Sequence, residues 1–263
     1  MFSHVTAGQL WGLSLPDEVC AQLVLDVMRH SDRTPVRRVG CRGHRGLESR
    51  SVARRAGLPV TSLADTWVDL GELTMMKDGH QRLTLDDLVV LGDEVATRLI
   101  GPPEPGATPN SPQLVDSAVG LLGTALEGRV RARGGMVLAE ALRLVRAPVR
   151  SPMETRARLM FVRSGFPEPR VNLPVYGDDD GQWLLEGDLV WERERVIGEY
   201  QGKDHASIRR RSLDAARART ALDEGWRILE IYADDVYRPP RRRACLHGFA
   251  GALGLDLGTL RIT

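Results

Sequence analysis

The arrangement of apolar and polar positions is clearest in the last third of the chain. Two apolar runs, 184–191 and 195–201, have the length and composition of strands, and the polar residues 192–194 between them predict a tight turn. In order, the expected elements are a helix over 151–163, strands over 170–176, 184–191 and 195–201, a helix over 207–224 and a strand over 226–232. This order predicts a compact mixed sheet with helices packed on its faces.

The pattern is weaker before residue 150. The segment 101–113 is rich in Pro, Gly and Ser and has no apolar period, which is typical of a linker. The other expected elements are a helix over 7–13, strands over 23–28 and 36–41, and helices over 61–70, 84–99, 114–131 and 137–145. We therefore expect an α/β chain of the α+β type, with a smaller α+β domain at 1–100, a linker at 101–113, connecting helices at 114–150 and a C-terminal domain at 151–263.

Composition narrows the class of protein. The 263 residues carry a formal net charge of only +1, which argues against a purely electrostatic DNA coat protein but allows an enzyme with a local basic groove. The three cysteines lack CxxC spacing, so we expect reduced thiols and no zinc site built from them. Because no apolar run approaches the length of a membrane span and no signal-peptide pattern is present, we expect a cytoplasmic protein with no membrane partner.

Candidate chemistry gathers on the two central strands. Side chains alternate along a strand, so Glu199 and Gln201 are expected to share a face, and Asp188 on the neighbouring strand can converge with them. Paired carboxylate oxygens suit a hard divalent cation such as Mg²⁺, which takes one or two carboxylates plus water and phosphate oxygens. These residues indicate a metal-dependent phosphodiesterase.

The last third also carries a family resemblance. The residues concerned are SPMETRARLMFVRSGFPEP, GDLVW, GEYQGKDH and GWRILEI, within 151–231. With this order of elements, they resemble the PD-(D/E)XK nuclease superfamily, and more closely its very-short-patch-repair (Vsr)-like branch, whose fold is a restriction-endonuclease-like mixed sheet. The resemblance implies that Asp188 and Glu199, with a main-chain carbonyl, hold magnesium (or manganese in its place). It implies that Glu154 is the helix acid of the site, orienting water or a second ion.

The chain departs from the family pattern at the third position of the (D/E)-X-K triplet, where Gln201 replaces lysine. A neutral amide cannot supply the positive charge that lowers the pKa of an attacking water. Lys203, one of only two lysines in the chain, could substitute for it, and His205 resembles a family histidine that could act as general base. The arginines expected to hold the phosphate backbone are Arg209, Arg210, Arg211, Arg217 and Arg219.

A second resemblance lies near the N-terminus. The segments FSHVTAGQLWGLSLP and GLPVTSLADTWVDL resemble the region that follows the winged helix in AbiEi-like antitoxins of bacterial abortive-infection systems. No winged helix precedes Phe2, so we expect the usual DNA-reading module to be missing and a protein partner to bind through residues 1–100. The two resemblances together imply an endonuclease acting on nucleic acid, DNA in the first place, in phage defence, a toxin–antitoxin module or repair.

Each functional interpretation has a structural alternative. Ser151, Pro152 and Glu154 fit a capping box at a helix start, Gln201 could be a polar group of an edge strand, and the arginines could form a solvated helix face. Arg241–Arg243 are expected in a loop. No metal-site spacing is recognised among His4, His30, His44, His80 and His247. The alternative function is a non-catalytic, antitoxin-like regulator that reuses the nuclease fold to bind nucleic acid or a partner; Gln201 and the near-neutral charge favour it.

Overall fold

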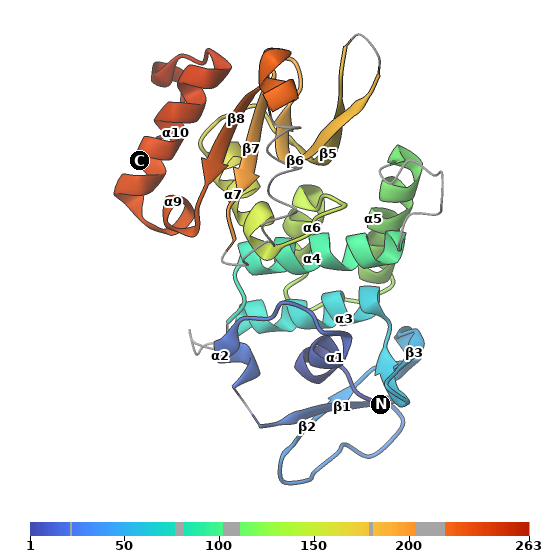
Figure 1. Cartoon of the computed structure of the whole chain (residues 1–263). Coiled ribbons are helices and arrows are strands. Elements are labelled where there is room, and N and C mark those ends of the chain that lie inside the picture. The colour runs from blue at the N-terminus through green and yellow to red at the C-terminus, as the bar shows by residue number, and fades with distance from the viewer. Residues whose placement is uncertain (22, 77–81, 102–110, 179–180, 203–218, 263) are drawn as a thin grey trace. The chain divides into compact units, whose positions relative to one another are not determined.

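The computed structural model describes residues 1–262 except 22, 77–81, 102–110, 179–180 and 203–218. The chain divides into two compact units, Met1–Pro148 and Val149–Thr263 (Figure 1). Both units combine helices with small sheets, so the expected α+β class is confirmed. The boundary lies two residues before the expected start of the C-terminal domain, and the segment 114–148, expected to connect two domains, lies within the first unit.

The first unit contains two short β-ribbons that Phe2 joins. Phe2 bridges Val27 of one ribbon and Val60 of the other. The second ribbon is a hairpin whose turn residues, Ala56 and Gly57, both have positive φ, as a type I′ turn requires. The strands are the parallel pair β1 (Leu25–Arg29) and β2 (Cys41–Arg45), and the antiparallel pair β3 (Val52–Arg55) and β4 (Leu58–Thr61).

The first unit also contains several helices. They are α1 (His4–Trp11), α2 (Asp17–Cys20), α3 (Leu63–Leu70), α4 (Leu85–Ile100), α5 (Pro112–Glu127), α6 (Gly135–Leu144) and the 3₁₀ turns η1 (Leu47–Ser49) and η2 (Gly71–Met75). Polar caps start two of them: Ser62 accepts a bond from the Asp65 N–H at the start of α3, and Thr84 forms a capping box with Asp87 at the start of α4. Both helices then bury their apolar faces against each other.

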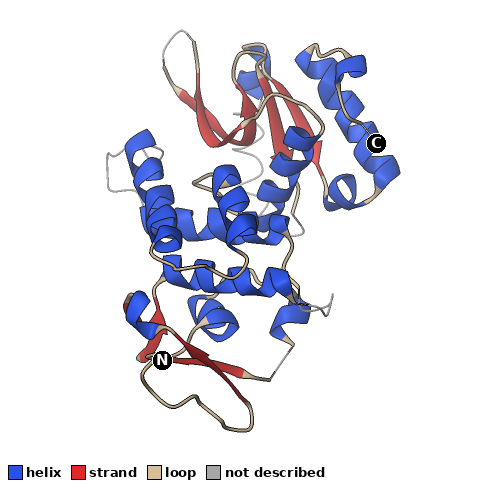
Figure 2. Cartoon of the chain, turned by 180° about the vertical axis from the view of Figure 1, so that it is seen from behind, coloured by secondary structure: helices blue, strands red, loops and turns tan. Residues whose placement is uncertain are grey.

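The core of the first unit is built around Trp67 of α3. Its side chain is fully buried, and its indole N–H donates to the Leu88 carbonyl of α4 at 2.9 Å. Helices α5 and α6 pack on α3 and α4 and complete this core. Figure 2 shows this group of helices from behind, with the two ribbons beneath it in red.

Two further features fix the segment between α5 and α6. Arg129 donates to Asp65 at 2.6 Å, and its guanidinium also lies 3.7 Å from Asp69, with all three side chains buried. Gly134 starts α6 with φ +72, and a Cβ at this position would lie 2.1 Å from the Gly71 carbonyl oxygen. The backbone of η2 therefore leaves room only for glycine there.

The sequence-based elements of the first unit differ from the structure in several places, of which two concern strands. The strand expected over 36–41 is wrong: residues 34–38 are irregular, and the strand begins at Cys41. Val36 can lie close to strand β2 because position 43 is a glycine: a Cβ on Gly43 would lie 2.7 Å from the Val36 carbonyl oxygen. The β3–β4 hairpin was not predicted, because VARR and LPVT carry charge and proline where an apolar alternation was sought.

The second unit is built on one four-stranded sheet of order β5-β6-β7-β8 (Figure 1). The strands are β5 (Arg170–Tyr176), β6 (Trp183–Trp191), β7 (Val196–Tyr200) and β8 (Arg227–Ile231). The first three form an antiparallel meander, and β8 pairs in parallel with β7. Besides the helical residues 219–223, the helices with both ends described are α7 (Pro152–Arg163), α9 (Ala233–Tyr237), α10 (Pro239–Leu253) and the 3₁₀ turn η4 (Leu257–Thr259).

Two apolar clusters cover this sheet. The first, which we call the aromatic core, contains Phe161 of α7, Trp191 of β6 and Phe249 of α10, with the Phe161 ring 5.1 Å from Trp191 and 4.7 Å from Phe249 in edge-on contact. The second, which we call the Trp226 core, contains Trp226 together with Leu173, Val175, Leu184, Val190, Ile197 and Ala221. The sheet is therefore packed on both faces.

The expected strands of this unit agree closely with the structure, and the C-terminal region differs. Arg241–Arg243 lie in α10, not in a loop, so that expectation is wrong. Pro239 is compatible with a helix because proline is favoured in the first helical turn. Of the helix expected over 207–224, only the end from Arg219 is described, where it is helical up to Asp223.

Among the described residues, no helix is both long and apolar enough to cross a membrane.

Candidate active site of the second unit

The alternation of side chains along β5 is interrupted at Asn172. Val171 packs against the aromatic core, whereas Leu173 belongs to the Trp226 core. Residues two apart normally share a face of the sheet, so the strand has turned over between them. Asn172 has φ +44, a conformation that asparagine tolerates better than most residues, and its side chain is buried.

The same change of face occurs on β6, directly opposite, at Asp188. Leu189 belongs to the aromatic core, but a Cβ on Gly187 would touch Val190 and Ile197 of the Trp226 core. The ladder between β5 and β6 pairs Val171 with Leu189 and Leu173 with Gly187, and skips the position between them. Asp188 therefore leaves the regular pleat.

The Asp188 side chain also accepts a hydrogen bond from the backbone of the next strand, β7, in place of a backbone carbonyl. The β6–β7 ladder ends at Leu189 and Gly198, and one step further would set Asp188 opposite Glu199. There the Tyr200 N–H donates to the Asp188 carboxylate at 2.8 Å. Asp188 and Glu199 thus lie close enough for the negative charge of Asp188 to raise the pKa of Glu199, after the larger effect of burial.

Glu154 joins this pair from the start of α7. Its carboxylate accepts from the Asn172 amide at 2.8 Å, from the Arg150 backbone N–H at 3.0 Å and from the Ser151 hydroxyl at 2.8 Å. Ser151 in turn accepts from the Glu154 N–H, and Pro152 occupies the first helical position. The Ser151 N-cap and Pro152 at the first helical position are therefore confirmed, but the reciprocal bond of a capping box is not formed, because Glu154 accepts from the N–H of Arg150 and not of Ser151. The capping role of Glu154 is compatible with a role in the site, because Asn172 of β5 donates a hydrogen bond to the Glu154 carboxylate.

Burial and neighbouring negative charges raise the pKa of two of these carboxyl groups, Asp188 and Glu199. Burial, and then the negative charge of Glu154, raise the pKa of Asp188 to about 6, against the opposing effect of the Tyr200 N–H. Burial raises the pKa of Glu199 to about 8, with further contributions from the charges of Asp188 and Glu154. Acidic groups with pKa values shifted this far by burial and by each other are typical of functional sites.

Arg150 is the cation that acts on both shifted groups. Its positive charge lowers the pKa of Asp188 and of Glu199, but only as a minor contribution. The guanidinium is exposed and forms a close ion pair with Glu186 of β6. It therefore lies near the acidic group at the surface without neutralising it.

The remaining predicted site residues are not brought into this arrangement by the described structure. Gln201 is exposed, and its backbone N–H continues the β7–β8 pairing by donating to the Ile231 carbonyl at 2.8 Å. Lys203, His205, Arg209, Arg210, Arg211 and Arg217 lie outside the described residues. Arg219 is exposed in the last helical turn before Gly225. Sequence reasoning missed Asn172 and Arg150, which carry no motif of their own.

A separate cluster in the first unit was not expected. Among the described residues, His4, His44 and Glu72 form a group of three side chains that could bind a metal ion. Each offers one ligand atom, and these atoms lie within 4.8 Å of one another. No local spacing could reveal it, because the residues come from α1, β2 and η2. The histidines show no metal-site spacing along the sequence, but the structure brings two of them, His4 and His44, together with Glu72.

Comparisons with known proteins identify relatives but no family. No family model matches the chain, and no solved structure matches it. The chain is similar to two proteins of Mycobacterium tuberculosis, the uncharacterized protein MT2308 of strain CDC 1551 / Oshkosh and the uncharacterized protein Rv2248 of strain H37Rv. Each is 34% identical over 116 residues, which is 43% of this chain and 42% of the relative. The match thus spans less than half the length of these relatives.

Proposed function

We propose that the second unit is a metal-dependent endonuclease, that its substrate is DNA, and that Asp188 and Glu199 hold its divalent cation. The observation that carries the proposal is that Asp188 leaves the regular pleat of β6 beside Glu199, close enough for its charge to raise the pKa of Glu199. The order of α7, an antiparallel meander and a parallel fourth strand supports the resemblance to PD-(D/E)XK nucleases.

The chemistry of the site fits a hard cation. Two partly buried carboxylates with raised pKa values, beside a third, repel one another, and a divalent ion would relieve that repulsion. Magnesium would be held by Asp188 and Glu199, with Glu154 beside them, and when bound would polarise the scissile phosphate. Manganese has the same preference for oxygen ligands and is expected to substitute.

The chain's own residues have distinct tasks in this proposal. Asn172 and Ser151 hold the Glu154 carboxylate in place through hydrogen bonds. The Tyr200 N–H orients Asp188. Arg150, whose side chain is 62% exposed beside the acidic group, is available to contact a phosphate oxygen of the substrate once it leaves Glu186.

One observation favours a second function. A pKa of about 8 for Glu199 means that a proton neutralises this carboxyl group at neutral pH without any metal. With Gln201 in place of the family lysine, the unit could then serve as a non-catalytic, antitoxin-like module that binds nucleic acid or a protein. The two functions differ in one measurable property, the requirement for a divalent cation.

Cleavage assays separate the two functions. We would incubate supercoiled plasmid and single-stranded DNA with the full chain and Mg²⁺ or Mn²⁺, comparing wild type with Asp188→Asn and Glu199→Gln. Both substitutions keep the size of the side chain, and Asn at 188 keeps an oxygen for the Tyr200 N–H. The matched control is Glu230→Gln, since Glu230 is the β8 residue in register with Glu199 but is exposed.

The proposal predicts cation-dependent cutting in wild type and in the control, and a loss of at least a hundredfold in each site variant. Restoring the family lysine with Gln201→Lys is expected to increase cutting. Absence of cutting in wild type with either cation, together with DNA binding that is unchanged by EDTA, would instead identify the binding module.

A further inference from the structure

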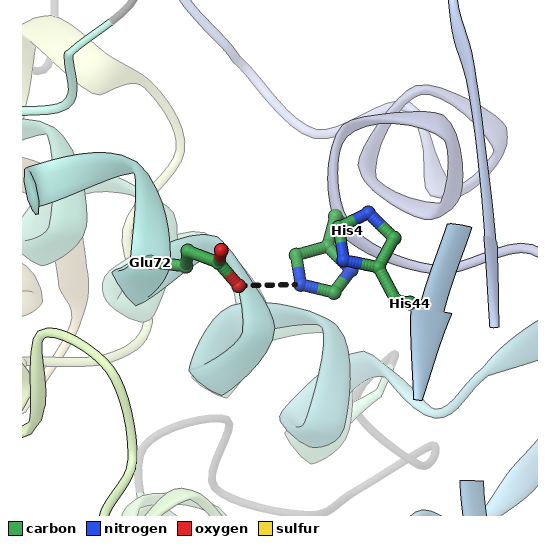
Figure 3. A group of neighbouring side chains, drawn as sticks. All are labelled: His4, His44 and Glu72. Carbon is green, nitrogen blue, oxygen red and sulfur yellow. Dashed lines mark ion pairs between the residues drawn. The ribbon is translucent and has the colours of Figure 1, made fainter. Parts of the chain in front are cut away.

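Three elements of the first unit converge on one point. His4 opens α1, His44 lies in β2 and Glu72 lies in η2. The His4 Nε2 atom is 3.4 Å from a Glu72 carboxylate oxygen, and the two imidazole rings stack with centroids 3.6 Å apart (Figure 3). His4 is almost completely buried and has φ +48, an unusual conformation for a residue other than glycine.

We propose that His4, His44 and Glu72 bind a divalent transition-metal ion of the zinc class. Two imidazoles and one carboxylate are the protein ligands of one common type of open zinc site. Imidazole nitrogen selects zinc, nickel, copper or iron over magnesium and calcium, which prefer oxygen. The proposed site therefore differs in ion class and in position from the acidic site of the second unit, and does not depend on it.

The distances require only side-chain movement. Ligand atoms around a tetrahedral zinc ion lie about 3.4 Å apart, given bonds of about 2.0–2.1 Å. The three ligand atoms lie within 4.8 Å of one another, so closure is on the order of 1 Å. A metal lies close to the plane of each imidazole that binds it, and the planes are now 18° apart and stacked. His44, the less buried of the two, would tilt out of the stack upon binding.

Both histidines already have the outer partners that metal-binding imidazoles have. The His44 Nε2 atom lies 2.8 Å from the carboxylate of Asp26, which is buried, and this leaves Nδ1 as the atom that Asp26 does not engage. The His4 Nδ1 atom is 2.9 Å from the Ser3 hydroxyl, which leaves Nε2 toward Glu72. Such contacts fix ring orientation and make the other nitrogen a better ligand.

The surroundings leave room for a fourth ligand. The three residues line a cavity of about 600 Å³, whose wall also contains Arg45, Arg131 and Arg133. Three protein ligands with an open position are typical of zinc sites that bind water or substrate. The arginines favour an anionic fourth ligand such as a phosphate oxygen.

Arg133 provides a specific test of the site. Its guanidinium forms a close ion pair with Glu72 from an exposed position. A bound cation and Arg133 would compete for this carboxylate. Removing the arginine is therefore expected to raise metal affinity, a result that general destabilisation of the fold would not produce.

The experiment is a calorimetric titration of the metal-stripped full chain with Zn²⁺. The parent chain carries Asp188→Asn and Glu199→Gln, so that the acidic site contributes no metal binding. The zinc proposal is thereby tested independently of the proposed nuclease function. We expect one zinc ion per chain, with affinity reduced at least tenfold by His44→Gln and by Glu72→Gln, and increased by Arg133→Ala. The matched control is His30→Gln, because His30 is an exposed histidine of the same unit that pairs with Glu48.

Several results would overturn the proposal. They are the absence of stoichiometric zinc binding in the parent chain, and equal affinity in the parent, His44→Gln and Glu72→Gln. Circular dichroism melts establish that the variants are folded; should His44→Gln unfold, Glu72→Gln alone decides, since Glu72 is only partly buried. Cobalt substitution gives an independent result: a tetrahedral His/Glu site produces visible absorption bands, which Glu72→Gln is expected to alter.

Discussion

The strained carboxylates make the stability of the second unit depend on pH in a defined direction. The pKa of Glu199 is raised from 4.5 to about 8 in the folded protein, and that of Asp188 from 3.8 to about 6. Between its ordinary pKa and its raised pKa, each carboxyl group holds a proton in the folded state that it has released in the unfolded chain. The contribution of the two groups to stability is therefore fully present below about pH 4 and is lost as the pH rises toward 8 and above.

The size of the effect follows from the shift of Glu199. At about 1.4 kcal/mol per pKa unit, the rise corresponds to a loss on the order of 5 kcal/mol at pH 9. Glu199→Gln removes this ionisation. We expect the variant to be more stable than wild type at pH 9 by several kcal/mol and to match it at pH 4.5. Magnesium is expected to stabilise wild type at pH 8, where the pair ionises, and to have no effect on the variant.

Hydrogen exchange is the suitable assay, because it measures the second unit separately from the first. Protection factors of peptides covering β6 and β7, corrected for intrinsic exchange rates, are compared from pH 5 to 9 in wild type, Glu199→Gln and the control Glu230→Gln. The control should follow wild type throughout. Parallel pH profiles of wild type and Glu199→Gln would refute the reasoning that Glu199 ionises against its surroundings.

Three further predictions concern the first unit and are checked by urea denaturation. Gly134→Ala should cost more than about 2 kcal/mol, because its Cβ would meet the backbone of η2 at a positive φ; unchanged stability would show that this approach is not tight. Gly120→Ala, on the exposed face of α5 with nothing within 4 Å of its Cβ, should instead stabilise by about 0.5–1 kcal/mol. Arg129→Ala should cost about 3–5 kcal/mol, since it leaves Asp65 and Asp69 buried without this partner, and the cost should shrink when Asp65 is changed to Asn in the same chain.

The second unit was largely predictable from sequence because its strands carry regular apolar runs with clear stops. The bounds expected for β5, 170–176, coincide with those observed. The convergence of Asp188 with Glu199 followed from alternation on adjacent strands. Its detail did not, because the change of face at Asn172 depends on a backbone conformation that a polar residue can adopt but does not have to adopt.

Other features depend on tertiary contacts that no local pattern carries. The helix α10 opens with Pro239 and a run of arginines, and only Leu246, Phe249, Ala250 and Leu253 bury against the sheet. The histidine cluster joins His4 of α1, His44 of β2 and Glu72 of η2, which lie far apart in the sequence. Contacts between residues so far apart in the sequence could not be predicted from local patterns.

The parallel pairing of β8 with β7 has a consequence for the order of folding. The meander β5–β6–β7 joins neighbours through short turns, so its pairing closes little chain and can form early. β8 can join only after the chain has returned from Tyr200 to Arg227, a long closure that forms slowly. Glu199, on the strand that β8 covers, is therefore expected to remain hydrated and ionised at neutral pH in a folding intermediate that holds the meander alone. Its proton would then be taken up as the last strand docks, which makes the final folding step, and not the earlier ones, sensitive to pH.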